Sequence, residues 1–152
     1  MKDSIQKYFQ VGTIQWMSHP PISYDLLDSI KSIASDEYFS AVEVTSIMDE
    51  ETRKKVKHLL EQSHLKVCFG AQPSLLGPGL NPNDVDEDRR KQAEEVLIKA
   101  VDEAEYLGAG GIAFLAGKWE QDTKDLAYEQ LLKTTRSVCT HAAQKGMMVE
   151  LE

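Results

Sequence analysis

Hydrophobic residues alternate along the chain between two patterns. Five short stretches are rich in apolar and β-branched residues, and four longer stretches repeat apolar residues every three or four positions. Short apolar runs are typical of buried strands, whereas the longer period is typical of amphipathic helices. The predicted strands are 11–16, 41–47, 66–69, 111–115 and 147–151, and the predicted helices are about 23–34, 49–63, 84–107 and 124–145.

The third of these helices has the clearest signals. Its apolar residues form one stripe, made of Ala93, Val96, Leu97, Ala100, Val101, Ala104 and Leu107. Carboxylates between residues 84 and 88 precede the stripe, where they stabilise the exposed N–H groups and the positive end of the helix dipole. Gly108 follows it and is a typical helix stop. A strand followed by such a helix, repeated along the chain, indicates βα units around a parallel sheet.

Polar residues occupy alternate positions of the predicted strands. We expect the helix-facing side to carry Ile14, Val42, Val44, Val67, Phe69, Ile112, Phe114, Val149 and Leu151. The opposite side then carries Thr13, Gln15, Glu43, Thr45, Cys68, Gln72, Glu150 and Glu152. The hydrated open end of a (β/α)8 barrel accommodates such a face, and so does an open sheet with one solvated side. We favour the barrel because a helix follows every strand except the last.

Composition restricts the partners. The 152 residues include 17 Lys and Arg against 25 Asp and Glu, for a net charge of −8, so the molecular field repels nucleic acid. No apolar run approaches the roughly 18 to 20 residues that span a bilayer, and the first ten residues do not form a signal peptide. Cys68 and Cys139 lie far apart, which is typical of reduced thiols in a cytoplasmic protein. We therefore expect a cytoplasmic protein that binds neither nucleic acid nor membrane.

Two segments carry motifs that are more specific than the alternation of strands and helices. Residues 87–109 have arginine near their start and Leu107-Gly108-Ala109 at their end, and residues 142–152 form a helix end and a strand that closes with glutamate. The first resembles the third helix of the sugar phosphate isomerase/epimerase, or xylose isomerase-like, barrels, and the second is similar to their fourth helix and fifth strand, which ends in a metal-binding glutamate. The order and spacing of these motifs extend the resemblance over the whole chain.

The resemblance implies an α/β fold of the (β/α)8 TIM-barrel type, present as a partial barrel of about five parallel strands and four helices. Residues 1–152 would be the N-terminal part of one barrel domain, truncated after strand 5. The implied activity is isomerisation or epimerisation of a sugar or sugar phosphate, by proton transfer beside a carbonyl. The implied cofactor is a divalent ion, Mn, Mg or Co, held by Glu, Asp, His and Glu.

The first glutamate of that ligand set matches Glu152, which the resemblance makes both a metal ligand and an acid/base carboxylate. Glu150 is the alternative if the register differs by two residues. The other ligands would lie on strands 6 to 8, so we expect this chain alone to be inactive and to hold no catalytic ion tightly. Trp16, His19, Glu43 and Gln72 are the candidate substrate-binding residues. Packing of Trp16 on the following prolines and a structural role for Glu43 are the alternatives.

Three other functions remain open or are disfavoured. An inosose-type dehydratase of the same superfamily uses a similar ligand set, and the sequence does not separate it from an epimerase. A non-catalytic half-barrel fragment is the second alternative. Abasic-site endonucleases of this fold use histidines after strands 3 and 4, where this chain has Ala71-Gln72 and Leu115-Ala116-Gly117. Because the first and fifth strands would present unpaired edges, we also expect a homo-oligomer or association through those edges.

Overall fold

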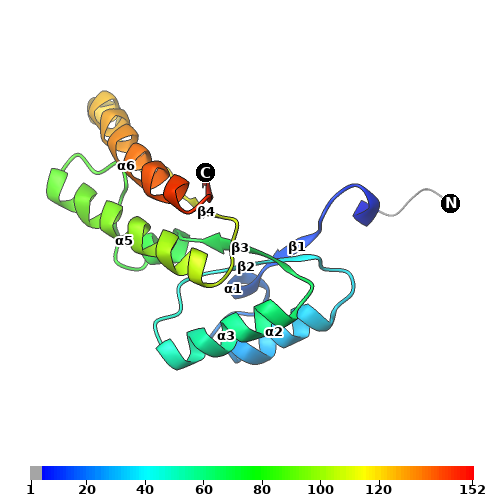
Figure 1. Cartoon of the computed structure of the whole chain (residues 1–152). Coiled ribbons are helices and arrows are strands. Elements are labelled where there is room, and N and C mark those ends of the chain that lie inside the picture. The colour runs from blue at the N-terminus through cyan, green and yellow to red at the C-terminus, as the bar shows by residue number, and fades with distance from the viewer. Residues whose placement is uncertain (1–4) are drawn as a thin grey trace.

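The computed structural model, which describes residues 5–152, contains one parallel sheet with helices packed along one of its faces (Figure 1). Its strands are β1 (Gly12–Ile14), β2 (Ala41–Val44), β3 (Lys66–Gly70), β4 (Gly111–Phe114) and β5 (Met148–Leu151). Each strand pairs in parallel with the next one in the sequence, in the order β1-β2-β3-β4-β5. This confirms the expected βα arrangement, with five strands of a TIM-barrel-type fold.

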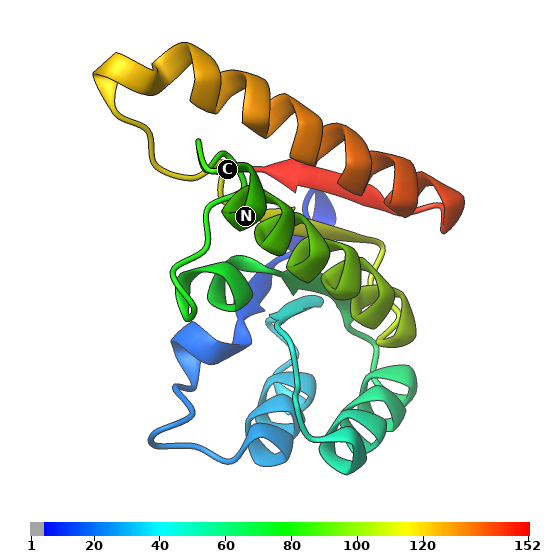
Figure 2. The same ribbon diagram turned by 90° about the vertical axis from the view of Figure 1, so that its left-hand side faces the viewer.

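The helices are α1 (Gln15–Ser18), α2 (Leu26–Ser35), α3 (Glu50–Gln62), α4 (Gln72–Leu76), α5 (Glu87–Tyr106) and α6 (Lys124–Gln144), with 3-10 turns η1 (Ile5–Lys7) and η2 (Gln121–Thr123). The side chains of Asp25, Asp49 and Asp86 accept backbone N–H groups in the first turns of α2, α3 and α5. These caps satisfy donors that have no partner within the helix, and so fix where each helix begins. In Figure 2, α6 lies along β5, and α5 packs beside α6.

The hydrophobic core lies between the sheet and these helices. The strands contribute Val42, Val44, Phe69, Ile112 and Phe114, and the helices contribute Ile30, Ile33, Val56, Leu60, Leu97, Val101 and Val138, all at most 3% exposed. The helices therefore cover one face of the sheet. The opposite face, here called the inner face, is left for polar side chains.

The register confirms the expected inner face for three strands and corrects it for β1. Glu43 pairs with Cys68 in β3, and Glu150 pairs with Ala113 in β4, so the polar positions of β2, β3 and β5 share one side. In β1, however, Ile14 pairs with Glu43. Ile14 therefore lies on the inner face, contrary to the prediction.

Strand β1 is also shorter than predicted, because the short helix α1 follows it directly. Thr13 pairs with Val42 and so faces the helices, which the sequence analysis assigned wrongly. The strand ends at Ile14, and Gln15 turns into α1, where it is 3% exposed. Its Nε2 donates to Oγ of Ser29 in α2 at 2.8 Å. A buried amide with this partner on the helix side is satisfied there, so Gln15 does not belong to the inner face.

Both borders of the sheet have an unpaired edge within the part of the chain that the structure describes. β1 pairs only with β2, and β5 pairs only with β4. On β5, Met148 and Leu151 are 62% and 46% exposed. The free N–H and C=O groups of such an edge, together with exposed apolar residues, can pair with a strand from another chain or another part of the protein. None of the helices between residues 5 and 152 is long and apolar enough to cross a bilayer.

Candidate functional site

Four of the five residues predicted to form the site lie at the carboxyl end of the sheet. Trp16 is in α1 directly after β1, and Glu43 is in β2. Gln72 begins α4 after β3, and Glu152 follows β5. Because the strands are parallel, these ends meet at one edge of the sheet, which is where α/β proteins place their ligands. Their roles in binding and catalysis stay predictions.

Three of these side chains converge on Gly70, the last residue of β3. A methyl group added to Gly70 would lie 2.5 Å from Oε1 of Glu43 and 2.5 Å from Oε1 of Gln72, and it would also collide with the indole ring of Trp16. The absence of a side chain at Gly70 therefore lets the three groups surround one point. The sequence analysis did not single out this glycine, although its place at a strand end between candidate residues was a signal.

The two oxygens at this point lack hydrogen-bond donors. Oε1 of Glu43 and Oε1 of Gln72 are buried atoms without a hydrogen-bond partner in the described structure. Buried acceptors of this kind are rare in native proteins and are satisfied by water, an ion or a ligand.

Glu152 is held in place although it follows the last strand residue. Its backbone N–H donates to the carbonyl of Phe114 at 3.0 Å, and its carbonyl accepts from the N–H of Ala116 at 2.8 Å. Nε2 of Gln72 donates to Oε2 of Glu152 at 3.1 Å. The exposed carboxylate is therefore tied by its backbone to β4 and by its side chain to the group around Gly70.

The inner face is electrostatically negative. Burial raises the pKa of the Glu43 carboxyl, and the nearby Glu152 and Glu150 raise that pKa further. Burial also raises the pKa of the Cys68 thiol, and Glu43 adds to the effect. Cys68 is therefore protonated at neutral pH and is not an activated nucleophile. A carboxyl with a raised pKa is suited to exchange protons with a substrate.

The raised pKa of Glu43 predicts a pH-dependent gain in stability for Glu43→Gln. Because folding favours the protonated carboxyl, its ionisation destabilises the folded state above the raised pKa. We expect a higher free energy of unfolding for the variant at pH 7 in urea titrations. The gain should vanish as the pH falls through the raised pKa to below 4.5, the ordinary value, because both states are then protonated.

The matched control is Glu95→Gln on α5, which removes an exposed carboxylate far from the inner face. The free energy of unfolding of this variant should change between pH 7 and pH 4 by the same amount as that of the wild type. Equal behaviour of the two variants would contradict the assignment of Glu43 as a carboxyl that is destabilised by its surroundings.

His19 lies apart from this group. Nδ1 of His19 is 3.0 Å from Oγ of Ser18, and the imidazole packs edge-on against the ring of Tyr24 at 4.9 Å between centroids. Nothing in these contacts directs His19 to the point beside Gly70. Glu150 is exposed on the inner face and lies two residues before Glu152, one layer deeper.

The residues present do not form a metal centre by themselves. Within residues 5–152, no three His, Cys, Asp or Glu side chains gather closely enough to hold a metal ion. The oxygens of Glu43, Gln72 and Glu152 are of the type that hard cations bind, but no third carboxylate, histidine or cysteine of the described residues joins the two glutamates.

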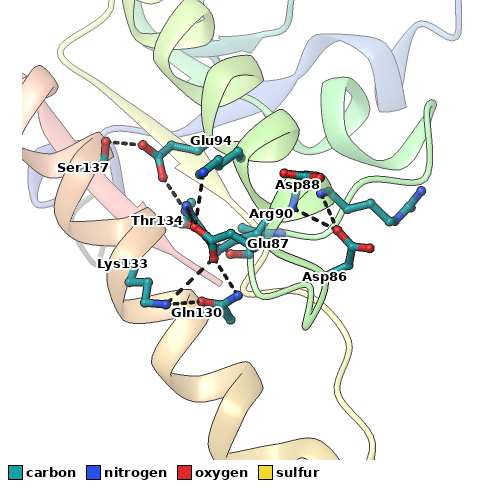
Figure 3. A network of polar contacts seen from close by, with 12 residues as sticks. Asp86, Glu87, Asp88, Arg90, Glu94, Gln130, Lys133, Thr134 and Ser137 are labelled. Carbon is teal, nitrogen blue, oxygen red and sulfur yellow. Dashed lines mark hydrogen bonds and ion pairs between the residues drawn. The ribbon is translucent and has the colours of Figure 1, made fainter.

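A polar network holds the loop that borders the site (Figure 3). Arg90, which is 4% exposed, donates to Glu87 at 2.9 and 3.1 Å, to Oγ1 of Thr134 at 2.9 Å, and to Glu94. Oγ1 of Thr134 donates in turn to the carbonyl of Pro82 at 2.8 Å. The network thus connects α5 and α6 with the loop before α5. The arginine near the start of this helix was noted in the sequence, but its contacts were not predicted.

The loop in turn contacts the turn after β4. Oδ1 of Asn81 accepts the backbone N–H of Lys118 at 3.2 Å. Oδ1 of Asn83 lies where a side chain on Gly117 would be, and Gly117 has a φ of 94°, in the left-handed region that favours glycine. Glu152, Asn81 and Lys118 line one cleft of about 200 Å³ beside this turn. Arg90 therefore supports one wall of the candidate site.

Comparison with protein families identifies the fold family. The family described as xylose isomerase-like TIM barrel matches residues 33–152. The chain therefore belongs to the xylose isomerase-like TIM barrel family. No match was found among curated proteins.

Solved structures show the same fold at low sequence identity. A D-tagatose 3-epimerase-like protein superposes with a TM-score of 0.77 and 18% identity, over 94% of this chain and 52% of that protein. A family 2 AP endonuclease from Brucella melitensis gives a TM-score of 0.74, 16% identity, and coverage of 94% and 55%. A 3-keto-D-glucoside 4-epimerase from E. coli superposes with a TM-score of 0.69 and 17% identity, over 92% of this chain and 54% of that protein. The chain thus spans about half the length of the structures that it resembles.

Proposed function

We propose that this chain provides the N-terminal half of the site of a sugar isomerase or epimerase, which moves a proton at a carbon beside a carbonyl group. The observation that supports this most directly is the pair of donorless acceptor oxygens of Glu43 and Gln72, gathered with Trp16 around Gly70. Sugar hydroxyls supply the missing donors, and the indole ring packs on the carbon face of a sugar.

Glu152 is the proposed acid/base residue. Its carboxylate is exposed, is anchored at its backbone, and accepts a hydrogen bond from Gln72. This geometry holds one carboxylate oxygen while the carboxylate remains open to a substrate bound over Gly70. A carboxylate positioned in this way can remove a proton from the carbon beside the carbonyl, and Glu43, with its raised pKa, can return one to the sugar oxygen or carbon.

The other half of the site must come from strands beyond the described residues. The chain spans 52% of the epimerase-like structure to which it is similar, and both edges of the described sheet are unpaired. We infer that further strands, from the same polypeptide or from a second copy, complete the barrel. If a divalent ion takes part, ligands beyond the described residues must hold it.

Cleavage of nucleic acid is disfavoured, although one similar structure is called an AP endonuclease. The net charge of −8 opposes binding of a polyanion. The ends of β3 and β4 carry Gln72 and Leu115 to Gly117, and no histidine stands there. Carbonyl chemistry on a neutral polyol fits the inner face better than hydrolysis of a phosphodiester.

Solvent deuterium exchange tests the proposal without knowledge of the product. The complete protein, with added Mn²⁺, Mg²⁺ or Co²⁺, is incubated in D₂O with a panel of ketoses, sugar phosphates and inosose-type polyols. An isomerase or epimerase introduces deuterium at the carbon beside the carbonyl, which NMR or mass spectrometry detects. A dehydratase would instead release water and form an unsaturated product.

Gly70→Ala is the matched variant for this experiment. The added methyl group displaces the ends of Trp16, Glu43 and Gln72, so we expect exchange or binding to weaken by about tenfold or more. Gly110→Ala is the control, because a methyl group on Gly110 meets no atom within 4 Å. Absence of exchange with every substrate, or equal activity of both variants, would contradict the proposal.

A further inference from the structure

A second cleft lies next to the candidate site, at the carboxyl end of β4. It has a volume of about 500 Å³ and is lined by Asn81, Asn83, Asp84, Val85, Lys118, Trp119, Glu120, Thr123 and Ala127. Asn81 and Lys118 also line the cleft that contains Glu152. The two clefts are therefore neighbours that share a wall. A ligand large enough to extend from Glu152 past Lys118 would enter the second one.

Trp119 gives this cleft an aromatic platform. The residue is 53% exposed, which is unusual for the largest apolar side chain, and it lies on the turn that follows β4. Nζ of Lys124 lies 5.2 Å from the centroid of the indole ring. The electron-rich face of an indole attracts the C–H groups on one face of a sugar ring, and the ring nitrogen adds a hydrogen-bond donor.

Polar groups surround the platform at fixed positions. Asn83 is only 4% exposed, and its Oδ1 has no hydrogen-bond partner in the described structure. Asn81 is held by the backbone N–H of Lys118. Between them, the carbonyl of Pro82 is bound by Thr134, which Arg90 also contacts. The asparagines thus lie on a loop that these bonds hold in place, and Oδ1 of Asn83 is buried against Gly117.

The charges around the cleft are mixed. Asp84 and Glu120 are acidic, and Asp84 is already paired with Arg89 at 2.9 Å. Lys118 lines the cleft and Nζ of Lys124 lies beside the indole ring of Trp119, so a phosphorylated sugar is the competing ligand. Uncharged hydroxyls can bond to amides, carboxylates and lysine alike.

We propose that the cleft at Trp119 binds a second, uncharged sugar ring, so that the substrate class of this protein is a glycoside or disaccharide rather than a sugar phosphate. The inference rests on the proposed function, because it requires one ring to occupy the site beside Gly70 and Glu152. It extends that function from a reacting sugar to a neighbouring ring that the protein also recognises.

The two tryptophans of the chain allow each ring to be observed separately. In NMR spectra of the complete, ¹⁵N-labelled protein, the indole N–H signal of Trp16 reports on the first position and that of Trp119 on the second. Trp16→Phe and Trp119→Phe assign the two signals. The probes are methyl glycosides, a panel of disaccharides such as cellobiose, maltose and lactose, and glucose 6-phosphate.

We expect at least one disaccharide to shift both indole signals and to bind about tenfold more tightly than the methyl glycosides, which should shift Trp16. In Trp119→Ala, this advantage of the disaccharide should fall below about threefold. Tyr38→Ala is the control, since Tyr38 is 52% exposed but lies before β2, at the other end of the sheet. It should leave the ratio of the two affinities unchanged.

The outcomes separate the two proposals. If methyl glycosides shift Trp16 but no disaccharide shifts Trp119 or gains affinity, the second position is wrong and the proposed function stands. Tightest binding of glucose 6-phosphate, or an unchanged ratio in Trp119→Ala, would also overturn the inference. If no sugar shifts the signal of Trp16, both proposals fail.

Discussion

Arg90→Met is expected to lower the free energy of unfolding by about 3 kcal/mol, since removing one partner of a buried ion pair typically costs 3–5 kcal/mol. Arg90 is 4% exposed and binds Glu87, Glu94 and Thr134 together. Methionine keeps the length of the side chain but leaves Glu94 without its cation, and leaves Glu87 with only Lys91 and Lys133, at 3.9 and 3.8 Å. The partial exposure of Glu87 and Glu94, 44% and 25%, lets water compensate in part, so the lower end of the range is expected.

The same variant should show a characteristic pH dependence. The hydrogen bond from Arg90 is the main reason that the pKa of Glu87 is lowered to about 2. A carboxyl with a lowered pKa stabilises the fold fully above its ordinary pKa of 4.5, and this contribution is lost as the pH falls towards 2. The difference between wild type and Arg90→Met in urea titrations should therefore be largest near pH 7 and shrink below about pH 4.5.

Arg89→Met is the control for Arg90→Met. The neighbouring arginine is 50% exposed, pairs with the 17% exposed side chain of Asp84, and donates to the carbonyl of Gly79 at 2.7 Å. Exposed ion pairs contribute roughly 0 to 1 kcal/mol, so this variant should cost about 1 kcal/mol or less. Equal losses in the two variants would show that the buried network around Arg90 does not hold α5, α6 and the loop together.

Glu152→Gln is expected to reduce proton exchange in the complete protein by about 100-fold or more. General acid–base groups contribute roughly 10²- to 10⁴-fold to rates, and glutamine keeps the shape of the side chain without its ability to accept a proton. The amide can still contact Gln72, so substrate affinity should change much less than turnover. Deuterium exchange with the best substrate of the panel, measured at several concentrations, separates the two effects.

Glu150→Gln is the matched control on the same strand and the same face. Because Glu150 lies one layer deeper and has no contact with Gln72 among the bonds of the described residues, exchange should fall by less than about threefold. If Glu150→Gln lost activity while Glu152→Gln kept it, the acid/base assignment would move by two residues.

The elements with several turns or several β-branched residues were predictable from the sequence. Strands β2 to β5 and helices α2, α3, α5 and α6 lie within a few residues of the predicted ranges. All of them bury a face against the core except β5, which packs on it through Val149. The short helices α1 and α4 were missed. With four and five residues, they are too short to show a helical period, and the predicted faces of Thr13 and Ile14 in β1 were wrong.

The candidate site could be predicted in part. The structure brings Trp16, Glu43, Gln72 and Glu152 to one end of the sheet, as strand order and alternation indicated. It leaves His19 outside the group, because a local bond to Ser18 and the ring of Tyr24 hold its imidazole. The cleft around Trp119 could not be predicted, since it depends on how two loops meet at Gly117, and loop conformation leaves no periodic pattern.

The order of the strands also bears on how the protein forms during synthesis. Because every strand pairs with the one made just before it, each βα unit can dock as it leaves the ribosome, without waiting for a distant partner. Trp16, Glu43 and Gln72 would then be assembled by the first three units, well before Glu152 is translated. The proposed sugar-binding group would mature early, and its acid/base residue would be added last.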